Sequence, residues 1–64
     1  MVKVNGEMLD TAGKTVTELL EAMQVSSSRV AVELNEQILP KAQYGETVLK
    51  DGDKVEVVRF VGGG

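Results

Sequence analysis

A single segment of this 64-residue chain places its apolar residues at helical spacing. Its four apolar positions follow an i, i+3, i+4, i+7 pattern and are Val16, Leu19, Leu20 and Met23. Thr15 and Glu18 fit a capping box, in which the threonine caps the first turn and the glutamate reaches back to it. A lone helix with one apolar side must bury that side against another layer, and the rest of the chain therefore has to supply a sheet.

The segments around this helix alternate apolar and polar residues, as half-buried strands do. We expect strands at residues 1–5, 7–10, 29–34, 37–39, 47–49 and 54–61. The dipeptide Asn5-Gly6 is a strong hairpin signal, Asn35-Glu36 is a plausible second turn, and Pro40 should end the strand before it. A tight turn is expected at 51–53, and a short helical turn at 42–44.

This order of elements predicts an α+β domain in two layers, with one main helix packed on a mixed four- to five-stranded sheet. The expected sheet-side partners of the helix are Val2, Val4, Val30, Val32, Val55 and Val57. The first and last strands should lie parallel at the centre of the sheet, which is the ubiquitin-like β-grasp pattern. We expect one domain over residues 1–61 and a flexible glycine tail at 62–64.

The composition argues against several classes of function. The chain has no Cys and no His, so it lacks the commonest nucleophile, the commonest general base and the usual zinc ligands. We therefore expect neither a metal site nor an enzyme acting alone. Seven basic residues, scattered singly, stand against ten acidic ones, which disfavours nucleic acid as a partner. No membrane span or signal peptide is visible, and the absence of Cys favours a cytoplasmic protein.

The sequence ends in Gly62, Gly63 and Gly64, directly after an apolar strand. A frayed tail is one interpretation. The other is functional, because three extended residues reach about 10 Å and carry no side chains that would block a narrow channel. The reactive group there is the α-carboxylate of Gly64, a poor electrophile that must be activated, most simply as an acyl-adenylate made from ATP. The chain has no phosphate-cradling loop, so a partner enzyme must supply the activation and the chain acts as a carrier.

Three stretches of the sequence carry a specific resemblance, namely residues 31–41, the turn at 51–53 and the end at 57–64. Together they resemble the ThiS family, the sulfur-carrier proteins of thiamin biosynthesis. The Asn5-Gly6 turn and the helix start at 15–20 also match, so the resemblance covers nearly the whole chain. Two departures are small: Lys41 stands where the family often has arginine, and Gly62 extends the usual glycine pair.

The resemblance implies a cycle of reactions at the end of the chain. A ubiquitin-activating-type (ThiF-like) adenylyltransferase would adenylate the Gly64 carboxylate, next to Gly63, using ATP and magnesium. Sulfur from cysteine, passed on by a cysteine desulfurase, would convert the adenylate to a thiocarboxylate. A thiazole synthase (ThiG-like) would then take the sulfur into the thiazole ring. On this view the chain binds no cofactor itself.

The last strand also suggests where partners bind. If Val55 and Val57 pack under the helix, Val58 and Phe60 lie on the uncovered face of the sheet, where an apolar patch would suit docking. Phe60 folding over a local edge is an equally good interpretation. Arg59 could pair with an acidic partner groove, although a lone surface arginine is more often solvated. If this surface docks a partner, Gly62 is expected to contact the same partner.

Three other functions stay open at this point. The small subunit of molybdopterin synthase shares the fold and the terminal glycines, but its members are typically longer. A ubiquitin-like modifier would form an isopeptide bond between Gly64 and a lysine. A plain interaction module would have an inert tail. Adenylation followed by thiocarboxylate formation separates the carriers from the last two.

Overall fold

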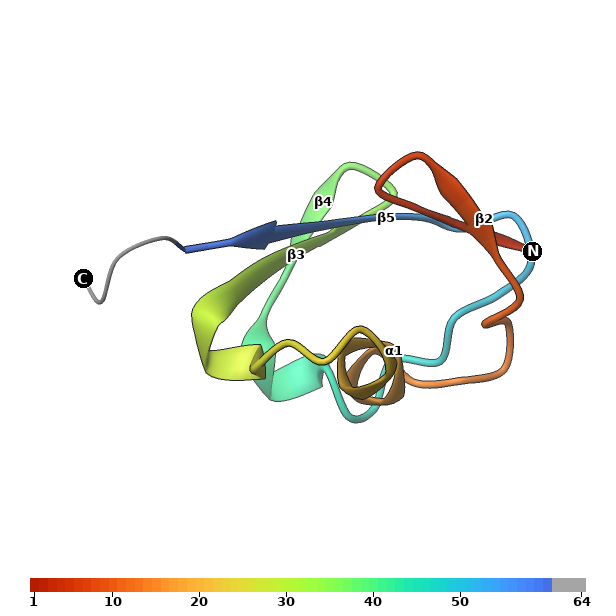
Figure 1. Cartoon of the computed structure of the whole chain (residues 1–64). Helices are drawn as coiled ribbons and strands as arrows, with labels where there is room; N and C mark the ends of the chain where they lie inside the picture. Colours follow the sequence, from red (N-terminus) through yellow and green to blue (C-terminus); the bar gives the residue numbers. More distant parts are fainter. Residues whose placement is uncertain (61–64) are drawn as a thin grey trace.

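The computed structural model describes residues 1–60. Five short strands, one α-helix and two 3₁₀ turns follow one another within this part of the chain (Figure 1). In chain order they are β1 (Val2–Val4), β2 (Glu7–Leu9), α1 (Val16–Ala22), η1 (Ser27–Arg29), β3 (Val30–Leu34), β4 (Gln37–Leu39), η2 (Lys41–Gln43) and β5 (Lys54–Arg59). The predicted α+β class is confirmed.

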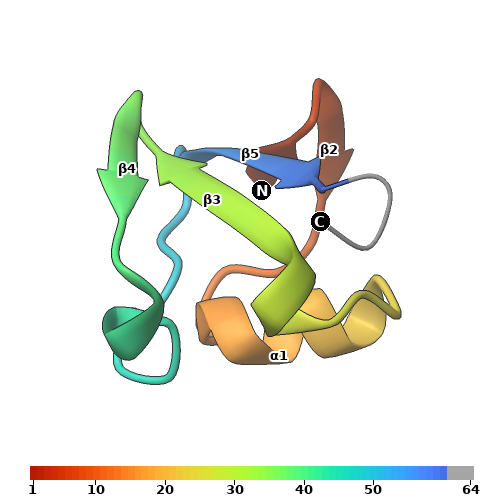
Figure 2. The ribbon, with the colours of Figure 1, turned by 90° about the vertical axis from the view of Figure 1, so that its left-hand side faces the viewer.

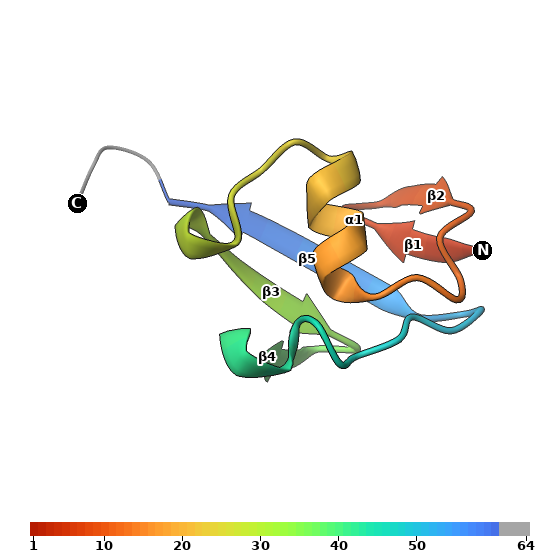
Figure 3. The same ribbon diagram turned by 90° about the horizontal axis from the view of Figure 1, so that it is seen from below.

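The five strands form one mixed sheet in the order β2-β1-β5-β3-β4. β1 runs parallel to β5, whereas β3 is antiparallel to both β5 and β4, and β1 is antiparallel to β2 (Figure 3). The first and last strands are therefore neighbours, as the β-grasp pattern predicts, and β5 is the central strand of the sheet. Within the described residues β5 ends at Arg59; the predicted last residue of this strand, Val61, lies outside them.

α1 lies across one face of the sheet and leaves the other face bare of helices within residues 1–60 (Figures 1 and 2). All six valines expected to face the helix are buried, together with Val16, Leu19 and Leu20 of the helix. Tyr44 and Leu49 complete this core, while Met23 is half-buried at its margin. These buried side chains lie between α1 and one face of the sheet. Removal of their apolar surface from water is the main source of stability for this small domain.

The start of α1 has the predicted capping box. The Thr15 hydroxyl accepts a hydrogen bond from the Glu18 backbone N–H at 3.1 Å, and the Glu18 carboxylate accepts one from the Thr15 N–H at 2.8 Å. The bond from the Thr15 N–H is the main cause that holds the pKa of Glu18 below its usual value, with the Thr15 hydroxyl and the charge of Lys14 adding to it. Two otherwise unpaired N–H groups are thereby satisfied.

Two tight turns hold β5 in place through their asparagines. Asn5 and Asn35 both have positive φ, of 50° and 52°, as two-residue hairpin turns require. The Asn5 side chain accepts a hydrogen bond from the Val57 N–H at 2.8 Å and donates one to the Val57 carbonyl at 3.3 Å. The Asn35 side chain accepts one from the Lys54 N–H at 3.0 Å. These bonds fix the register of the central strand against both hairpins.

One predicted strand is wrong. Residues 47–49 do not join the sheet; Val48 makes a single bridge with Thr15, in the segment that leads into α1. The Leu49 N–H donates to the Lys14 carbonyl at 2.8 Å, and the Leu49 side chain is buried in the core. Burial of Leu49 therefore holds this segment against the chain that leads into α1, away from the edge of the sheet. The helical turn predicted at 42–44 is present one residue earlier, as η2.

No helix within residues 1–60 has the length and apolar character needed to cross a membrane.

Candidate functional site

The candidate site lies where β5 ends. Beyond its last strand residue, the Phe60 N–H still donates to the Arg29 carbonyl at 2.9 Å, so the pairing with the chain before β3 continues for one more residue. The end of the domain is thus held at a fixed place beside η1. The predicted site residues Gly62, Gly63 and Gly64, and the predicted flexible tail they form, lie outside the described residues.

Val58 occupies the predicted place on the face of the sheet that α1 does not cover. Its neighbours Val55 and Val57 point toward the helix and are buried, whereas 52% of Val58 is exposed. Across the ladder it stands opposite Ala31 of β3. Phe60 is also exposed, at 58%. Two apolar side chains near the end of β5 are therefore open to solvent in this structure.

The ring of Phe60 has a cationic neighbour that the sequence pattern does not reveal. The Lys41 ammonium lies 5.8 Å from the centre of the ring, within range of a cation–π interaction. The same ammonium donates a hydrogen bond to the Ser28 carbonyl at 3.1 Å. Lys41 is the first residue of η2, which follows β4 in the chain. Because its contact with Phe60 depends on where η2 lies relative to β5, the spacing of residues in the sequence does not predict it.

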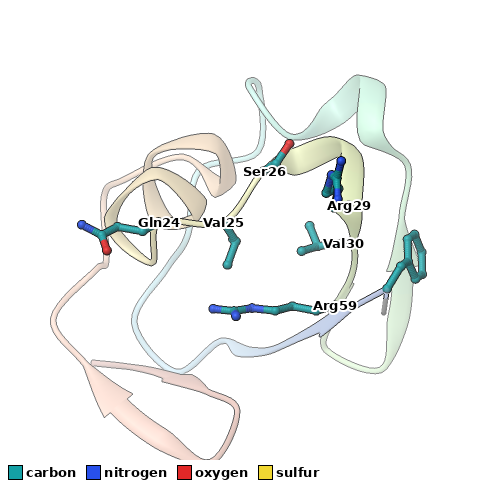
Figure 4. A pocket seen from close by; sticks show the side chains of 7 residues that line it. Gln24, Val25, Ser26, Arg29, Val30 and Arg59 are labelled. Atoms are coloured by element: carbon teal, nitrogen blue, oxygen red, sulfur yellow. The ribbon is translucent and has the colours of Figure 1, made fainter. Parts of the chain in front are cut away.

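Arg59 lines a shallow pocket of about 210 Å³ beside the end of β5. Val25 and Val30 point into it, and the long Arg59 side chain runs past them toward the turn after α1 (Figure 4). Arg29 also lines the pocket, but Figure 4 shows its side chain on the other side of Val30 from Arg59. The two guanidinium groups therefore do not converge on one point, and the pocket offers a cationic margin around a small apolar floor.

Charge is unevenly distributed around this end of the molecule. Three cationic side chains lie near Phe60, at the end of the described chain: Arg29, Lys41 and Arg59. Farther back along the uncovered face, Glu33 of β3 and Glu56 of β5 stand directly opposite each other. Strand alternation places Glu56 on the same face as Val58, whereas its pairing with Glu33 depends on the register between β3 and β5.

The predicted turn chemistry of Asp51-Gly52-Asp53 is present. The Asp53 carboxylate accepts hydrogen bonds from the Lys50 N–H at 2.9 Å and from the Asn35 amide at 3.1 Å. Gly52 has a φ of 93°, which favours glycine. Within residues 1–60 no three or more acidic, histidine or cysteine side chains gather as metal ligands would.

The comparisons with known proteins decide the family. The model of the ThiS family matches residues 2–64 of the chain. The chain belongs to the ThiS family. It is 45% identical to the sulfur carrier protein ThiS of Thermus thermophilus, over the whole length of both chains. It is also 47% identical, over 95% of its length, to part of a thiazole synthase of Paramagnetospirillum magneticum, of which it spans 19%.

A solved ThiS-family structure has the same fold. The crystal structure of the thiamine biosynthesis protein ThiS from Geobacter metallireducens superimposes with a TM-score of 0.78 and 43% sequence identity. The match covers 98% of this chain and 97% of that one. The ubiquitin-like β-grasp architecture described above is therefore that of the family.

Proposed function

We propose that this ThiS-family chain is a sulfur carrier of thiamin biosynthesis, acted on by enzymes and not itself an enzyme. The observation that carries the proposal is that the family match runs through Gly64 and so includes all three terminal glycines. The name of the Thermus thermophilus relative, identical at 45% of positions, supports the same function. The composition agrees, since a chain without Cys or His has no side chain suited to holding reactive sulfur.

The chemistry that we propose takes place at the Gly64 carboxylate. A carboxylate oxygen attacks the α-phosphorus of ATP, pyrophosphate leaves, and an acyl-adenylate forms. Hydrosulfide derived from cysteine then attacks the carbonyl carbon, the bond to AMP breaks, and a thiocarboxylate remains. When the acceptor takes the sulfur, the oxygen of water replaces it and restores the carboxylate. ATP and magnesium belong to the activating enzyme, which also supplies the phosphate-binding groups.

The partners that we propose are a ThiF-like adenylyltransferase, a cysteine desulfurase as the source of sulfur, and a ThiG-like thiazole synthase, all in the cytoplasm. The likeness to part of a thiazole synthase supports the last of these. The described structure supports a carrier role in one further respect. The Val57 N–H donates to the Asn5 side chain and the Phe60 N–H donates to the Arg29 carbonyl, and these bonds fix the end of β5. A partner that binds the domain therefore meets the end of this strand at a defined place.

The test is a mass measurement on the intact chain. We incubate it with a ThiF-like adenylyltransferase, ATP, magnesium, cysteine and a cysteine desulfurase, and measure its mass before and after. Replacement of one carboxylate oxygen by sulfur raises the mass of the chain by the difference between the two atoms. The proposal predicts this gain, located at Gly64 by fragmentation. An isopeptide bond between Gly64 and a lysine would identify a ubiquitin-like modifier instead. An unchanged mass would favour the interaction module with an inert tail.

A second measurement separates the two carriers. The purified thiocarboxylate form is given either to a thiazole synthase with its other substrates or to the large subunit of a molybdopterin synthase. Loss of the sulfur to the thiazole synthase supports the thiamin function. Transfer to the molybdopterin synthase alone contradicts it.

A further inference from the structure

The side chain of Asn5 continues the pairing of β1 with β5 beyond the end of β1. In the parallel ladder the Lys3 N–H donates to the Asp53 carbonyl at 2.9 Å. The Asn5 N–H donates to the Val55 carbonyl at the same distance. At the next position the Val57 N–H donates to the Asn5 side-chain oxygen at 2.8 Å, and the Asn5 side-chain nitrogen donates to the Val57 carbonyl at 3.3 Å. One side-chain amide therefore takes the place of a further residue of β1.

The residue after Asn5 makes this amide chemically labile. It is Gly6, whose backbone nitrogen is not shielded by a side chain of its own residue. In such a pair the glycine nitrogen attacks the side-chain carbonyl carbon of the asparagine, the bond from that carbon to the amide nitrogen breaks, and ammonia leaves with the proton of the attacking nitrogen. Water then opens the succinimide ring at either carbonyl and gives aspartate or isoaspartate. Asparagine is for this reason a thermolabile residue.

The folded chain opposes the reaction by conformation and not by burial, because Asn5 is exposed to water. Asn5 has a φ of 50°, in the left-handed region, where ψ is about 47°. At that ψ the side chain lies nearly trans to the Gly6 nitrogen about the Cα–C bond. Ring closure brings the two together, so the turn must open and both hydrogen bonds to Val57 must break. Loss of two ordinary hydrogen bonds alone corresponds to about a thirtyfold slower reaction.

The other hairpin provides a matched asparagine in the same chain. Asn35 has a φ of 52°, close to that of Asn5. Its side-chain oxygen accepts a hydrogen bond from the Lys54 N–H at 3.0 Å, and its side-chain nitrogen donates one to the Asp53 carboxylate at 3.1 Å. The residue that follows it is Glu36, whose side chain crowds the nitrogen that would attack. The fold thus holds both asparagines alike, whereas only Asn5 is labile once the fold is lost.

We propose that Asn5 is a site of spontaneous deamidation, which its turn and its contact with Val57 suppress in the folded chain and which unfolding exposes. The products cannot restore the contact. A carboxylate only accepts hydrogen bonds, so the aspartate product meets the Val57 carbonyl with no proton between them. Isoaspartate carries the backbone through its Cβ, and the extra atom in the turn disturbs the pairing of Val4 with Glu7. Deamidation therefore loosens the β1–β2 hairpin from β5, whether or not the chain carries sulfur.

The first experiment follows deamidation of the full chain in two solvents at one pH and temperature. The chain is incubated folded in buffer and unfolded in guanidinium chloride. A peptide of residues 1–12, incubated in both, corrects for the effect of the denaturant on the reaction itself. Chromatography and mass spectrometry of digests separate the asparagine, aspartate and isoaspartate forms. We expect Asn5 to react about thirtyfold more slowly in the folded chain, and Asn35 to stay intact in both solvents.

The second experiment measures the stability of the products. The isoaspartyl chain formed in denaturant is refolded and purified, and Asn5→Asp supplies the aspartate form directly. Each should melt about 5 °C below the parent chain, because the contact with Val57 is lost. Gln43→Glu adds the same charge at an exposed position of η2 and should melt with the parent. Hydrogen exchange at the Val57 N–H should be faster in the isoaspartyl chain.

Slow reaction in the folded chain together with less stable products supports the proposal. Equal rates in the folded and unfolded chains, after correction by the peptide, overturn the protection by the fold. If Asn5 survives in the unfolded chain as well as Asn35 does, the assignment of the site is wrong. Products that melt with the parent overturn the loosening of the hairpin.

Discussion

The two faces of the same sheet differ in how strongly the fold constrains them. On the covered face, Val55 and Val57 are buried under α1 with four other strand valines, and every one of these positions serves the core. On the uncovered face the same strand carries Glu56 and Val58, one beside a like charge and the other half exposed. The comparison teaches that the covered face accounts for folding, while the uncovered face carries residues that folding alone does not explain.

The largest expected effect on stability comes from the covered face. Leu20 of α1 is 1% exposed and lies among the buried valines. We expect Leu20→Ala to lower the free energy of unfolding by about 3 kcal/mol, because it removes buried methyl groups and leaves a cavity. Urea denaturation followed by circular dichroism measures this. A loss below about 1 kcal/mol would mean that α1 is not packed on the sheet as described.

A smaller loss is expected where the β1–β2 hairpin joins β5. Asn5→Gly keeps the positive φ of the turn but removes both side-chain hydrogen bonds to Val57. We expect a loss of about 1–2 kcal/mol in the same denaturation assay. Gln24→Gly is the matched control, because Gln24 also has positive φ, of 61°, but does not pair with β5. Equal stability of Asn5→Gly and the parent chain would contradict the role given to this amide.

The capping box predicts an effect that depends on pH. The pKa of Glu18 is lowered in the folded chain, mainly by the hydrogen bond from the Thr15 N–H, so its unfolded form takes up a proton at a higher pH. Its contribution to stability is present above the usual glutamate pKa and disappears as pH falls through the lowered value. The melting temperature of Glu18→Gln should therefore lie below that of the parent at pH 7, with a gap that closes in acid. A difference in melting temperature that stays the same at every pH would contradict a stabilising role of the Glu18 charge.

The smallest effect on stability is expected at the end of β5. Phe60→Ala removes a ring that is 58% exposed and contacts Lys41, so we expect a change in unfolding free energy below about 0.5 kcal/mol. Its affinity for the adenylyltransferase or the thiazole synthase should fall more clearly. The two quantities are compared in one preparation, with Val48→Ala, another exposed apolar position, as the control. A large loss of stability with unchanged affinity would contradict the docking role.

The sequence predicted what local patterns determine. The capping box at Thr15, the apolar side of α1 and the inward valines follow from spacing alone, and all are confirmed. The predicted strand at 47–49 is wrong because a short apolar run cannot show whether it pairs with a sheet or, as here, is held by the burial of Leu49.

The candidate site was less predictable for the same reason. Alternation along β5 placed Val58 on the uncovered face, and the structure agrees. The pairing of Glu56 with Glu33 can be predicted only when the register between β3 and β5 is known. The contact of Lys41 with Phe60 likewise depends on the path of the chain through η2. No short run of residues determines either of them. The predicted roles of Gly62, Gly63 and Gly64 rest on the family match and on chemistry.

The central claim is that the Gly64 carboxylate is the group that carries sulfur. It is tested most directly by a semisynthetic chain whose C-terminus is an amide, compared with the same chain bearing a free acid. In a reconstituted thiazole synthesis with labelled cysteine as the source of sulfur, we predict label in the thiazole with the free acid and none with the amide. Equal labelling from the two chains would contradict the account.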